Sequence, residues 1–520
     1  MCISLSINKR YFLILFALYF SSVCIAQKED FNWLGGYNYD NLPPDTLIIE
    51  GYRIDFNNKP FRIDNNIDVK YGILGNNASI SDKNGNLLFY TNGCAIMDRN
   101  MNIMPNGDSI NGGKWFDLNR LHCSFGYPGF QDVLILNDPA SEYGYYIFHK
   151  PNIYYPQIDD SLQLHYSYVD MRLNNGLGDV TVKNKRYVQN QNLLSSYFTA
   201  IKHQNKKSWW IIQPLEEDSL FLTFLLDGTG INRLANQNTH QYFDRFRSSA
   251  SGTAKFSPDG TKYAVYNYYD QLHVYDFDRE TGILSNHQMI EIYPSNEIDR
   301  TEIRVGSVEW SPNSRFIYTA SRLKLHQVDM LENNPQNAVR LIDTFNGTQD
   351  PFSTTFALLI QGPDCRIYLT PVGGQYSIHV INKPDEKGTA CDFVQNGIKF
   401  LYPNGGTLPN FPRFRVDEEE KCDPTITSIF GDAVYYRKKL SVYPNPSYGI
   451  YQLKIPTEFQ TGNLVVSDVF GKIVYNEQIE FNPVTMELNL THLPAASYNI
   501  DVYPENNNDR IFYGIQVIKL

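Results

Sequence analysis

Hydrophobic and polar positions alternate along most of this chain in short runs, and six of these runs share one arrangement. In each of the six, an apolar segment is followed by a tight polar turn and an aromatic segment. In the three clearest copies, the turn residues Asp259, Asn313 and Asp364 lie 54 and 51 residues apart. These copies occupy residues 251–284, 305–330 and 355–388, and three looser copies occupy 79–98, 131–150 and 196–215.

Each copy predicts a β-meander. In the copy at 251–284, Pro258 fixes φ, Asp259-Gly260 supplies the turn, and alternating apolar residues flank it. One such unit cannot bury both of its faces, and repetition every ~50–60 residues with about four strands per unit is typical of a β-propeller. We therefore expect an all-β chain with a propeller over residues 30–418.

Six copies leave the ring one blade short of the seven that we expect. A seventh blade can be built from segments near 45–65 and 408–416. Joining the two ends of the propeller sequence in one blade would close the ring and remove its exposed edges. Six or eight blades also fit the pattern.

The alternation resumes in shorter segments after an expected linker at 419–437. Turn signals then follow about every ten residues, which is typical of a small Ig-like β-sandwich. We expect this second domain at 438–520. Its predicted strands are 440–443, 450–455, 463–468, 472–480, 485–490, 498–503 and 511–519.

The first 26 residues have the pattern of a signal peptide. Lys9 and Arg10 precede an apolar run at 11–20, and a small residue, Ala26, stands before Gln27 at the expected cleavage site. The run is too short for a stable membrane anchor, and no later segment is apolar enough to span a bilayer. Lipidation at Cys24 is the alternative, but the residue before it is larger than a lipoprotein signal requires.

Composition narrows the class of protein and of partner. Hydrophobic residues make up 42% of the chain, aromatic residues 14% and charged residues only 19%, which is typical of a globular, β-rich protein. The formal net charge of −11 argues against nucleic acid or an anionic membrane as a partner, because both need a basic face.

Five of the seven cysteines lie beyond the expected signal peptide. An exported protein meets oxidising conditions, so disulfides are expected, and an odd number leaves at least one thiol unpaired. Spacing favours the pairs Cys365–Cys391 and Cys94–Cys123, with Cys422 left over; five buried, reduced thiols are the alternative. No Cys or His spacing matches a zinc site, and we predict no metal.

In the C-terminal segment, Tyr443-Pro-Asn-Pro446 is followed by a central turn at Asp468–Gly471 and by Tyr498 at the penultimate predicted strand. In the order and spacing of these residues the segment resembles the type A C-terminal sorting domain of the type IX secretion system of Bacteroidota. The resemblance covers about 80 residues, although Ala496 replaces a glycine that is usual in the family. It implies recognition by the type IX translocon, removal by a sortase-like peptidase, and a protein that is secreted or attached to the outer cell surface. An ordinary Ig-like module is the alternative. The motif residues are Tyr443, Pro444, Asn445, Pro446, Asp468, Gly471 and Tyr498.

The propeller resembles exported Bacteroidota proteins without a known activity, through the segments 88–111, 362–369, 379–393 and 406–416. The "FSPDG" turn at 256–260 also resembles that of Tol-type propellers, which mostly serve as binding platforms. We therefore expect a non-catalytic protein that binds a glycan or protein ligand at its end faces or central funnel. A hydrolase or lyase acting on polysaccharide, and a structural or adhesion component of the envelope, are the alternatives.

Catalytic signals are weak. No G-x-S-x-G nucleophile elbow occurs, and the "SPDGT" turn does not have the spacing of a sialidase Asp-box. We predict no catalytic residue and no cofactor. Three convergent charged side chains in the funnel would favour an enzyme, whereas an aromatic rim would favour a binder.

Two further sets of residues are candidates for surface chemistry. Trp209 and Trp210 are adjacent on a predicted strand, and one of them could stack on a ligand, although a core position is the more ordinary role. Four Asp-Ser/Thr-apolar triplets resemble Bacteroidota O-glycosylation sites, and capping of turns is the alternative. Their acceptor residues are Thr46, Ser109, Ser161 and Ser219.

Overall fold

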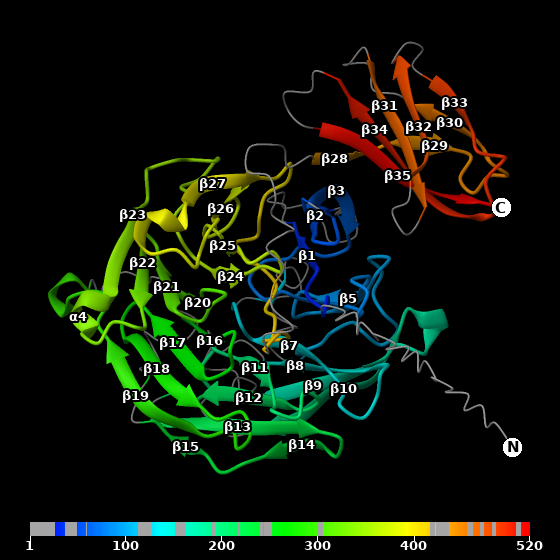
Figure 1. The fold of residues 1–520 in the computed structure, drawn as a ribbon. Coiled ribbons are helices and arrows are strands. Elements are labelled where there is room, and N and C mark those ends of the chain that lie inside the picture. Colours follow the sequence, from blue (N-terminus) through cyan, green and yellow to red (C-terminus); the bar gives the residue numbers. More distant parts are fainter. Residues whose placement is uncertain are drawn as a thin grey trace, which may run out of the picture.

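The fold was analysed in a computed structural model. It describes residues 27–36, 49–112, 126–150, 163–298, 305–416, 422 and 436–520, apart from short gaps at 59, 128, 189–190, 192, 217, 240–242, 244–251, 455–460, 469–472, 481–484 and 506–510. Two bodies are visible in Figure 1, a large ring of sheets and a smaller C-terminal module.

Seven antiparallel sheets follow one another around the ring in the described part of the chain, and we number them blades 1 to 7 (Figure 1). Blade 1 contains β1 (Asn32–Gly35), β2 (Ile49–Asp55) and β3 (Arg62–Val69), and blade 2 contains β4 (Ala78–Ser81), β5 (Leu87–Thr91) and β6 (Ile96–Asp98). Blade 3 contains β7 (Val133–Asn137), β8 (Gly144–His149), β9 (Leu164–Asp170) and β10 (Asp179–Val188). Blade 4 contains β11 (Thr199–Lys202), β12 (Trp209–Pro214), β13 (Leu220–Asp227), β14 (Gly230–Arg233) and β15 (Gln237–Asn238).

The remaining three blades have four strands each. Blade 5 contains β16 (Gly252–Phe256), β17 (Lys262–Asn267), β18 (Gln271–Phe277) and β19 (Leu284–Ile290). Blade 6 contains β20 (Gly306–Trp310), β21 (Phe316–Ser321), β22 (Lys324–Asp329) and β23 (Val339–Thr344). Blade 7 contains β24 (Leu359–Gln361), β25 (Ile367–Leu369), β26 (Ser377–Ile381) and β27 (Phe393–Lys399). Short helices are α4 (Pro335–Ala338), η2 (Asn174–Gly176), η3 (Ser295–Glu297) and η4 (Gly388–Cys391).

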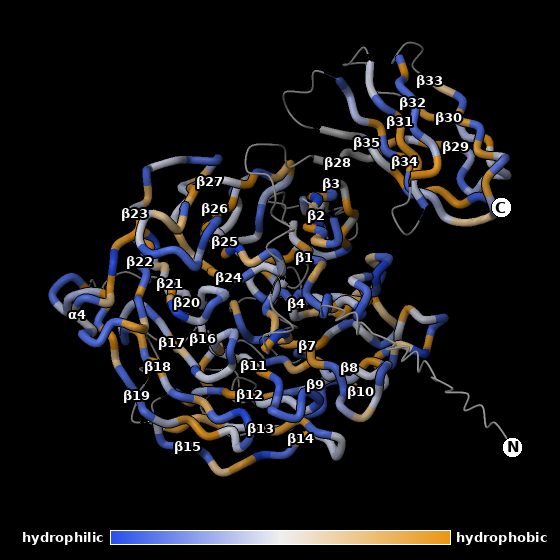
Figure 2. Tube along the Cα trace, in the orientation of Figure 1, coloured by the Kyte–Doolittle hydropathy of each residue, from blue (hydrophilic) through white to orange (hydrophobic). Residues whose placement is uncertain are grey.

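The six repeats predicted from sequence correspond to blades 2 to 7, and blade 5 shows why the pattern produces them. Along β17, Tyr263 and Val265 pack toward blade 4, while Ala264 and Tyr266 pack toward blade 6. Successive strand residues point to opposite faces, so a strand buried on both sides must be apolar at nearly every position. Figure 2 shows hydrophobic positions recurring along the strands of all the blades.

The prediction for the seventh blade was wrong in part. Blade 1 contains the N-terminal strands β1 to β3, and the segment near 45–65 belongs to it. The later strand that pairs with β3 lies at 436–439, whereas residues 408–416 form none of the strands of this blade. Pro409 and Pro412 lack the N–H groups that a ladder strand needs. Blades 7 and 1 close the ring by side-chain packing instead, with Trp33 and Tyr368 in edge contact at 5.2 Å between ring centroids.

The C-terminal module contains all seven predicted strands. Its strands are β29 (Ser441–Tyr443), β30 (Ile450–Lys454), β31 (Thr461–Asp468), β32 (Ile473–Glu480), β33 (Thr485–Asn489), β34 (Ala496–Pro504) and β35 (Ile511–Lys519). They form two sheets around a separate apolar core that includes Tyr451, Leu464 and Ile500. This arrangement is the predicted β-sandwich.

One strand joins the two bodies. β28 (Tyr436–Lys439) pairs in parallel with β3 of blade 1 on one side and with β35 of the module on the other. A continuous eight-stranded sheet therefore runs from the propeller into the module, in the order β1-β2-β3-β28-β35-β34-β31-β32. In the described part of the chain, no helix is long and apolar enough to cross a bilayer.

Candidate functional site

The central channel of the propeller is occupied by residues 404–416, which we call the channel segment. Asn404 is bonded to the loop between β25 and β26 of blade 7, and from Asn410 onward the hydrogen bonds go to inner strands or to the residues just before them. The donor-to-acceptor distances of the bonds named here are 2.6–3.1 Å. These bonds are Gly374 N to Asn404 O, Asn410 N to Asn77 O, Asn410 Nδ2 to Val133 O and to Phe198 O, and Arg413 N to Ala200 O. The segment thus satisfies backbone groups that face the channel, and it fills the passage where a ligand was expected to enter.

A cavity of about 240 Å³ remains at one end of the channel. It lies beside the turns that follow the inner strands of blades 5 and 6, around Pro258 and Pro312, and beside the end of the channel segment. Its wall includes the polar residues Lys255, Glu309, Gln361, Arg413 and Asn313 and the apolar residues Phe256, Phe411 and Phe414. We call this space the mouth cavity.

A buried network of charges fixes the floor of the mouth cavity. Arg413 Nη2 donates to Glu309 Oε1 at 2.8 Å and to the Phe256 carbonyl at 2.8 Å. Arg413 Nη1 donates to Gln361 Oε1 at 2.6 Å, and the Gln361 backbone N–H donates to Glu309 Oε2 at 3.1 Å. Because the Glu309 side chain is only 1% exposed, these contacts rigidly position the guanidinium.

Lys255 is the second cation on this floor. Its ammonium lies 3.8 Å from Glu309 Oε2, and its side chain is 9% exposed. Burial lowers the pKa of Lys255, an effect that the Glu309 carboxylate partly offsets.

The N-terminal end of the described chain reaches the same cavity. Arg415 pairs with Asp30 through both guanidinium Nη atoms, and its Nη1 also donates to the Gln27 carbonyl at 3.1 Å. The Gln27 side-chain oxygen accepts a 2.6 Å hydrogen bond from Lys202. The residue expected to follow signal cleavage is therefore attached to the channel mouth, while Ala26 lies outside the described residues.

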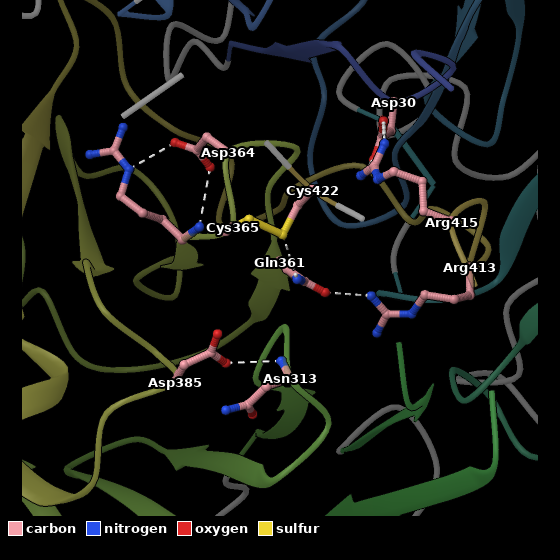
Figure 3. The surroundings of a disulfide bond; sticks show 10 residues. Asp30, Asn313, Gln361, Asp364, Cys365, Asp385, Arg413, Arg415 and Cys422 are labelled. Atoms are coloured by element: carbon pink, nitrogen blue, oxygen red, sulfur yellow. Dashed lines mark hydrogen bonds and ion pairs between the residues drawn. A yellow bond between two sulfur atoms is a disulfide. The ribbon is translucent and has the colours of Figure 1, made fainter. Parts of the chain in front are cut away.

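A disulfide at the mouth corrects the predicted pairing. Cys365 bonds to Cys422, which had been left over, and not to Cys391 (Figure 3). Cys365 occupies the inner turn of blade 7 at the mouth, whereas Cys391 is a free, buried thiol packed beside residues of blade 6. Proximity along one blade therefore did not place the two sulfur atoms together. Cys94 is disulfide-bonded, and Cys123 lies outside the described residues.

The two candidate stacking tryptophans are not available to a ligand. The Trp209 side chain is completely buried and Trp210 is 2% exposed. Trp210 Nε1 donates to the Arg279 carbonyl at 2.8 Å, and Trp209 Nε1 donates to the Asn137 carbonyl at 3.2 Å. Since the blade is covered on both faces, both indoles are core residues, and the prediction that one could be a surface contact was wrong.

The sorting motif tethers the start of the C-terminal module to its last strand. Asn445 Nδ2 donates to the Gln516 carbonyl at 3.1 Å, and Asn445 Oδ1 accepts from the Ile518 N–H at 2.8 Å. Tyr498 is buried in the module core, and its hydroxyl donates to the Pro494 carbonyl at 2.9 Å. Tyr443 is 55% exposed, and Gly471 lies outside the described residues.

The glycosylation candidates remain predictions. Ser109 and Ser219 are half-buried, and each follows an aspartate that forms a hydrogen bond with it. Thr46 and Ser161 lie outside the described residues. Across the described ranges, no group of three His, Cys, Asp or Glu side chains could hold a metal ion.

Sequence reasoning missed the charges of the mouth cavity, although a signal for them exists. Lys255 and Glu309 each stand three residues before the turn proline of their repeat, Pro258 and Pro312. Opposite charges at one repeat position, on inner strands that are otherwise uncharged, indicate neighbours that pair across two blades. Arg413 could not be found in this way, because its segment belongs to no repeat.

Comparisons with known proteins found one matching family and several similar solved structures. No curated protein matches the chain. The chain is similar to the solved propeller domain of Swd1 from Myceliophteria thermophila (11% identity, 72% of this chain and 93% of that one, TM-score 0.28) and to a gluconolactonase from Xanthomonas campestris (10% identity, 65% and 94%, TM-score 0.29). It is also similar to the extracellular domain of a putative hybrid two-component system from B. thetaiotaomicron (12% identity, 94% and 55%, TM-score 0.36).

All three TM-scores are below 0.5, so these structures carry no argument about the fold. The propeller is assigned from the strand pairing of the seven blades. Residues 441–511 match the family described as the secretion system C-terminal sorting domain. The matched segment begins at β29, the first strand of the module after β28. This domain indicates that the protein is secreted by the type IX system.

Proposed function

We propose that this protein is a secreted or surface-attached binding protein whose propeller holds a glycan or protein ligand, without catalysis, in the mouth cavity. The observation that carries the proposal is a concave, partly polar cavity whose walls are fixed by ion pairs and turns before any ligand arrives. Pre-formed cavities with a few convergent polar groups are the usual form of ligand sites.

Three basic side chains, Lys255, Arg413 and Arg415, do converge at the cavity, which is the arrangement expected to favour an enzyme. However, Arg413 is bonded to Glu309 and Gln361, and Arg415 is paired with Asp30. Groups committed to such contacts hold a shape, whereas a catalytic acid or base must exchange protons with the substrate. Both arginines are committed in this way, and among the described residues only Lys255 of the three lacks a hydrogen bond. One available cation, without a partner acid or base, favours binding over a hydrolase or lyase.

The export route is the second half of the proposal. The sorting domain agrees with a signal peptide at 1–26 that is cleaved before Gln27. It also agrees with recognition by a type IX translocon and a sortase-like peptidase, and with an origin in Bacteroidota. The contacts of Gln27 with Arg415 and Lys202 support processing at this point, because they hold the new N-terminus at the mouth.

Export is tested in a host that has a type IX system. A chain that lacks residues 441–520 should remain inside the cell, while the intact chain should appear outside with Gln27 as its first residue. Equal export of both chains would contradict the route.

Binding is tested by thermal-shift screening of the secreted protein against glycans and peptides. A ligand at 100 times its Kd should stabilise the fold by about 2.7 kcal/mol. Hydrogen exchange should then show protection of the turns at 257–261 and 311–315, with no change in β18 and β19. Protection confined to another face would contradict the assignment of the site, and release of new products from a bound polysaccharide would show an enzyme instead.

A further inference from the structure

The floor of the mouth cavity carries an unbalanced charge. Two cations, Lys255 and Arg413, share one carboxylate, that of Glu309, and the three side chains are 9%, 14% and 1% exposed. The other charged groups do not correct this balance: Asp30 is neutralised by Arg415, and Asp259 lies at the exposed rim with Oδ1 bonded within its own turn. A buried charge is costly unless it is paired, so the floor favours one additional negative charge.

Hydrogen bonding identifies which cation is available. Arg413 uses Nε, Nη1 and Nη2 for bonds to Phe256, Gln361 and Glu309. Lys255 has three N–H donors, yet among the described residues its ammonium has only the 3.8 Å ion pair with Glu309 and no hydrogen bond. Lys255 is thus the group that can offer strong hydrogen bonds to an incoming anion.

The remaining walls suit a small ring that bears hydroxyl groups. About 240 Å³ corresponds to roughly eight waters at liquid density, which is below the usual range for drug-sized ligands and near the size of one sugar unit. Pro258, Pro312 and Phe411 provide apolar surface for the faces of a ring. Asn313 lines the rim of the cavity, and its Nδ2 group donates to none of the described residues.

We propose that the mouth cavity binds a sugar unit that carries a carboxylate, such as a hexuronate of an acidic polysaccharide, and that the Lys255 ammonium holds this carboxylate. This inference rests on the proposed ligand-binding function and names its ligand class. Lys255 supplies the preference for the anion, and the amide and proline walls supply the preference for a ring.

The test compares two sugars that differ at one carbon. Calorimetric titration of the secreted protein with glucuronate and with glucose should give at least tenfold tighter binding of glucuronate at low ionic strength. Lys255→Met should remove this difference, and Lys255→Arg should retain most of it. Lys262→Met is the matched control, because Lys262 lies in the same blade and pairs with the surface residue Asp276; it should leave both affinities unchanged.

A second measurement needs no variant. Glucuronate, and not glucose, should protect Lys255 of the unaltered protein from N-acetylation by acetic anhydride, as measured by peptide mass spectrometry. A preference for glucuronate that survives Lys255→Met, together with no protection of Lys255, would overturn its role.

The outcomes separate the ligand class from the existence of the site. Equal binding of glucose and glucuronate in the cavity would overturn the inference of an anionic ligand and leave the proposed binding function standing. Tighter binding of N-acetylglutamate than of glucuronate would overturn the sugar assignment in favour of an acidic peptide. If glucuronate does not bind but another ligand is located in the cavity, only the inference of a carboxylate sugar is overturned. If no ligand protects the turns around the cavity from hydrogen exchange, both this inference and the proposed binding function are overturned.

Discussion

Arg413 and Glu309 form a buried ion pair at 2.8 Å between the channel segment and the inner strand of blade 6. They are 104 residues apart in sequence, and they lie on different elements of the fold. The pair fastens the segment that fills the channel to the wall of the channel. A contact that looks like part of a ligand site is therefore also a structural tie of the propeller.

Glu309→Gln tests this tie. The substitution leaves Arg413 and Lys255 on the cavity floor without a carboxylate, and removing one partner of a buried pair costs about 3–5 kcal/mol. Denaturant unfolding should show this loss in the free energy of unfolding. Lys262→Met breaks an ion pair that is partly exposed, Lys262–Asp276, and should change stability by less than about 1 kcal/mol. Similar values for the two variants would contradict the structural role.

Gly405→Ala tests how closely the channel segment fits. A Cβ atom at Gly405 would lie 1.9 Å from the Ile73 carbonyl oxygen, so the segment or the backbone before blade 2 must move. Overpacking of this kind costs about 1–3 kcal/mol, measurable by denaturant unfolding. Gly228→Ala is the matched control, because a Cβ there meets no atom within 4 Å. If the Gly405→Ala protein is as stable as the control, the space between Gly405 and the Ile73 carbonyl is wide enough for a methyl group, which would contradict the close fit.

The Cys365–Cys422 disulfide should stabilise the protein by restricting its unfolded chain. It closes a loop with a sequence separation of 57, for which the chain-entropy estimate is about 4 kcal/mol. The double variant Cys365→Ser/Cys422→Ser should show this loss in thermal or denaturant unfolding.

Alkylation and peptide mapping test the disulfide pairing itself. Burial raises the pKa of the Cys391 thiol to about 11, so this residue should resist alkylation at pH 8 until the protein unfolds. Peptide mapping without reductant should recover Cys365 linked to Cys422. Rapid alkylation of Cys391 in the native protein, or a Cys365–Cys391 peptide, would contradict the pairing.

Buried histidines should make the protein sensitive to mild acid. Burial lowers the pKa of His273, His326 and His379 from 6.5 to about 4 in the folded state. Between these values the unfolded chain binds more protons than the folded one, so stability is complete above pH 6.5 and falls as the pH decreases toward 4. Each histidine contributes up to about 1.4 kcal/mol per pH unit within this window.

His379→Gln measures one of these contributions. Unfolding free energies at several pH values should decline less steeply in the variant, by up to about 1.4 kcal/mol per pH unit between pH 6.5 and 4. An unchanged slope would show that His379 takes up a proton in the folded protein as easily as in the unfolded one.

The sequence predicts local structure well where a pattern repeats. Turns such as Pro258-Asp259-Gly260 recur at regular spacing, and all six predicted repeats and all seven strands of the C-terminal module are present. The sorting motif was recognised by its resemblance to a known family, and in the structure Asn445 makes its contacts within the C-terminal module alone.

The candidate site could not be predicted to the same degree. Arg413 acts through partners on blades 5, 6 and 7, and nothing in its local sequence indicates that its segment lies in the channel rather than in a blade. Cys365 was paired with Cys391 on the basis of spacing, whereas three-dimensional position at the mouth selects Cys422. Trp209 and Trp210 alternate as strand residues should, but both faces of their blade are covered.

The position of the channel segment also determines when the propeller can finish folding. Gln131 bonds to Asn410 across 279 residues, and Asn404 bonds to Tyr52 across 352 residues, so the ring cannot be completed until all its blades and residues 404–416 have been synthesised. Folding that depends on contacts so distant in sequence is slow. The propeller therefore becomes a rigid ring only when its last inner segment, residues 404–416, has been placed in the channel.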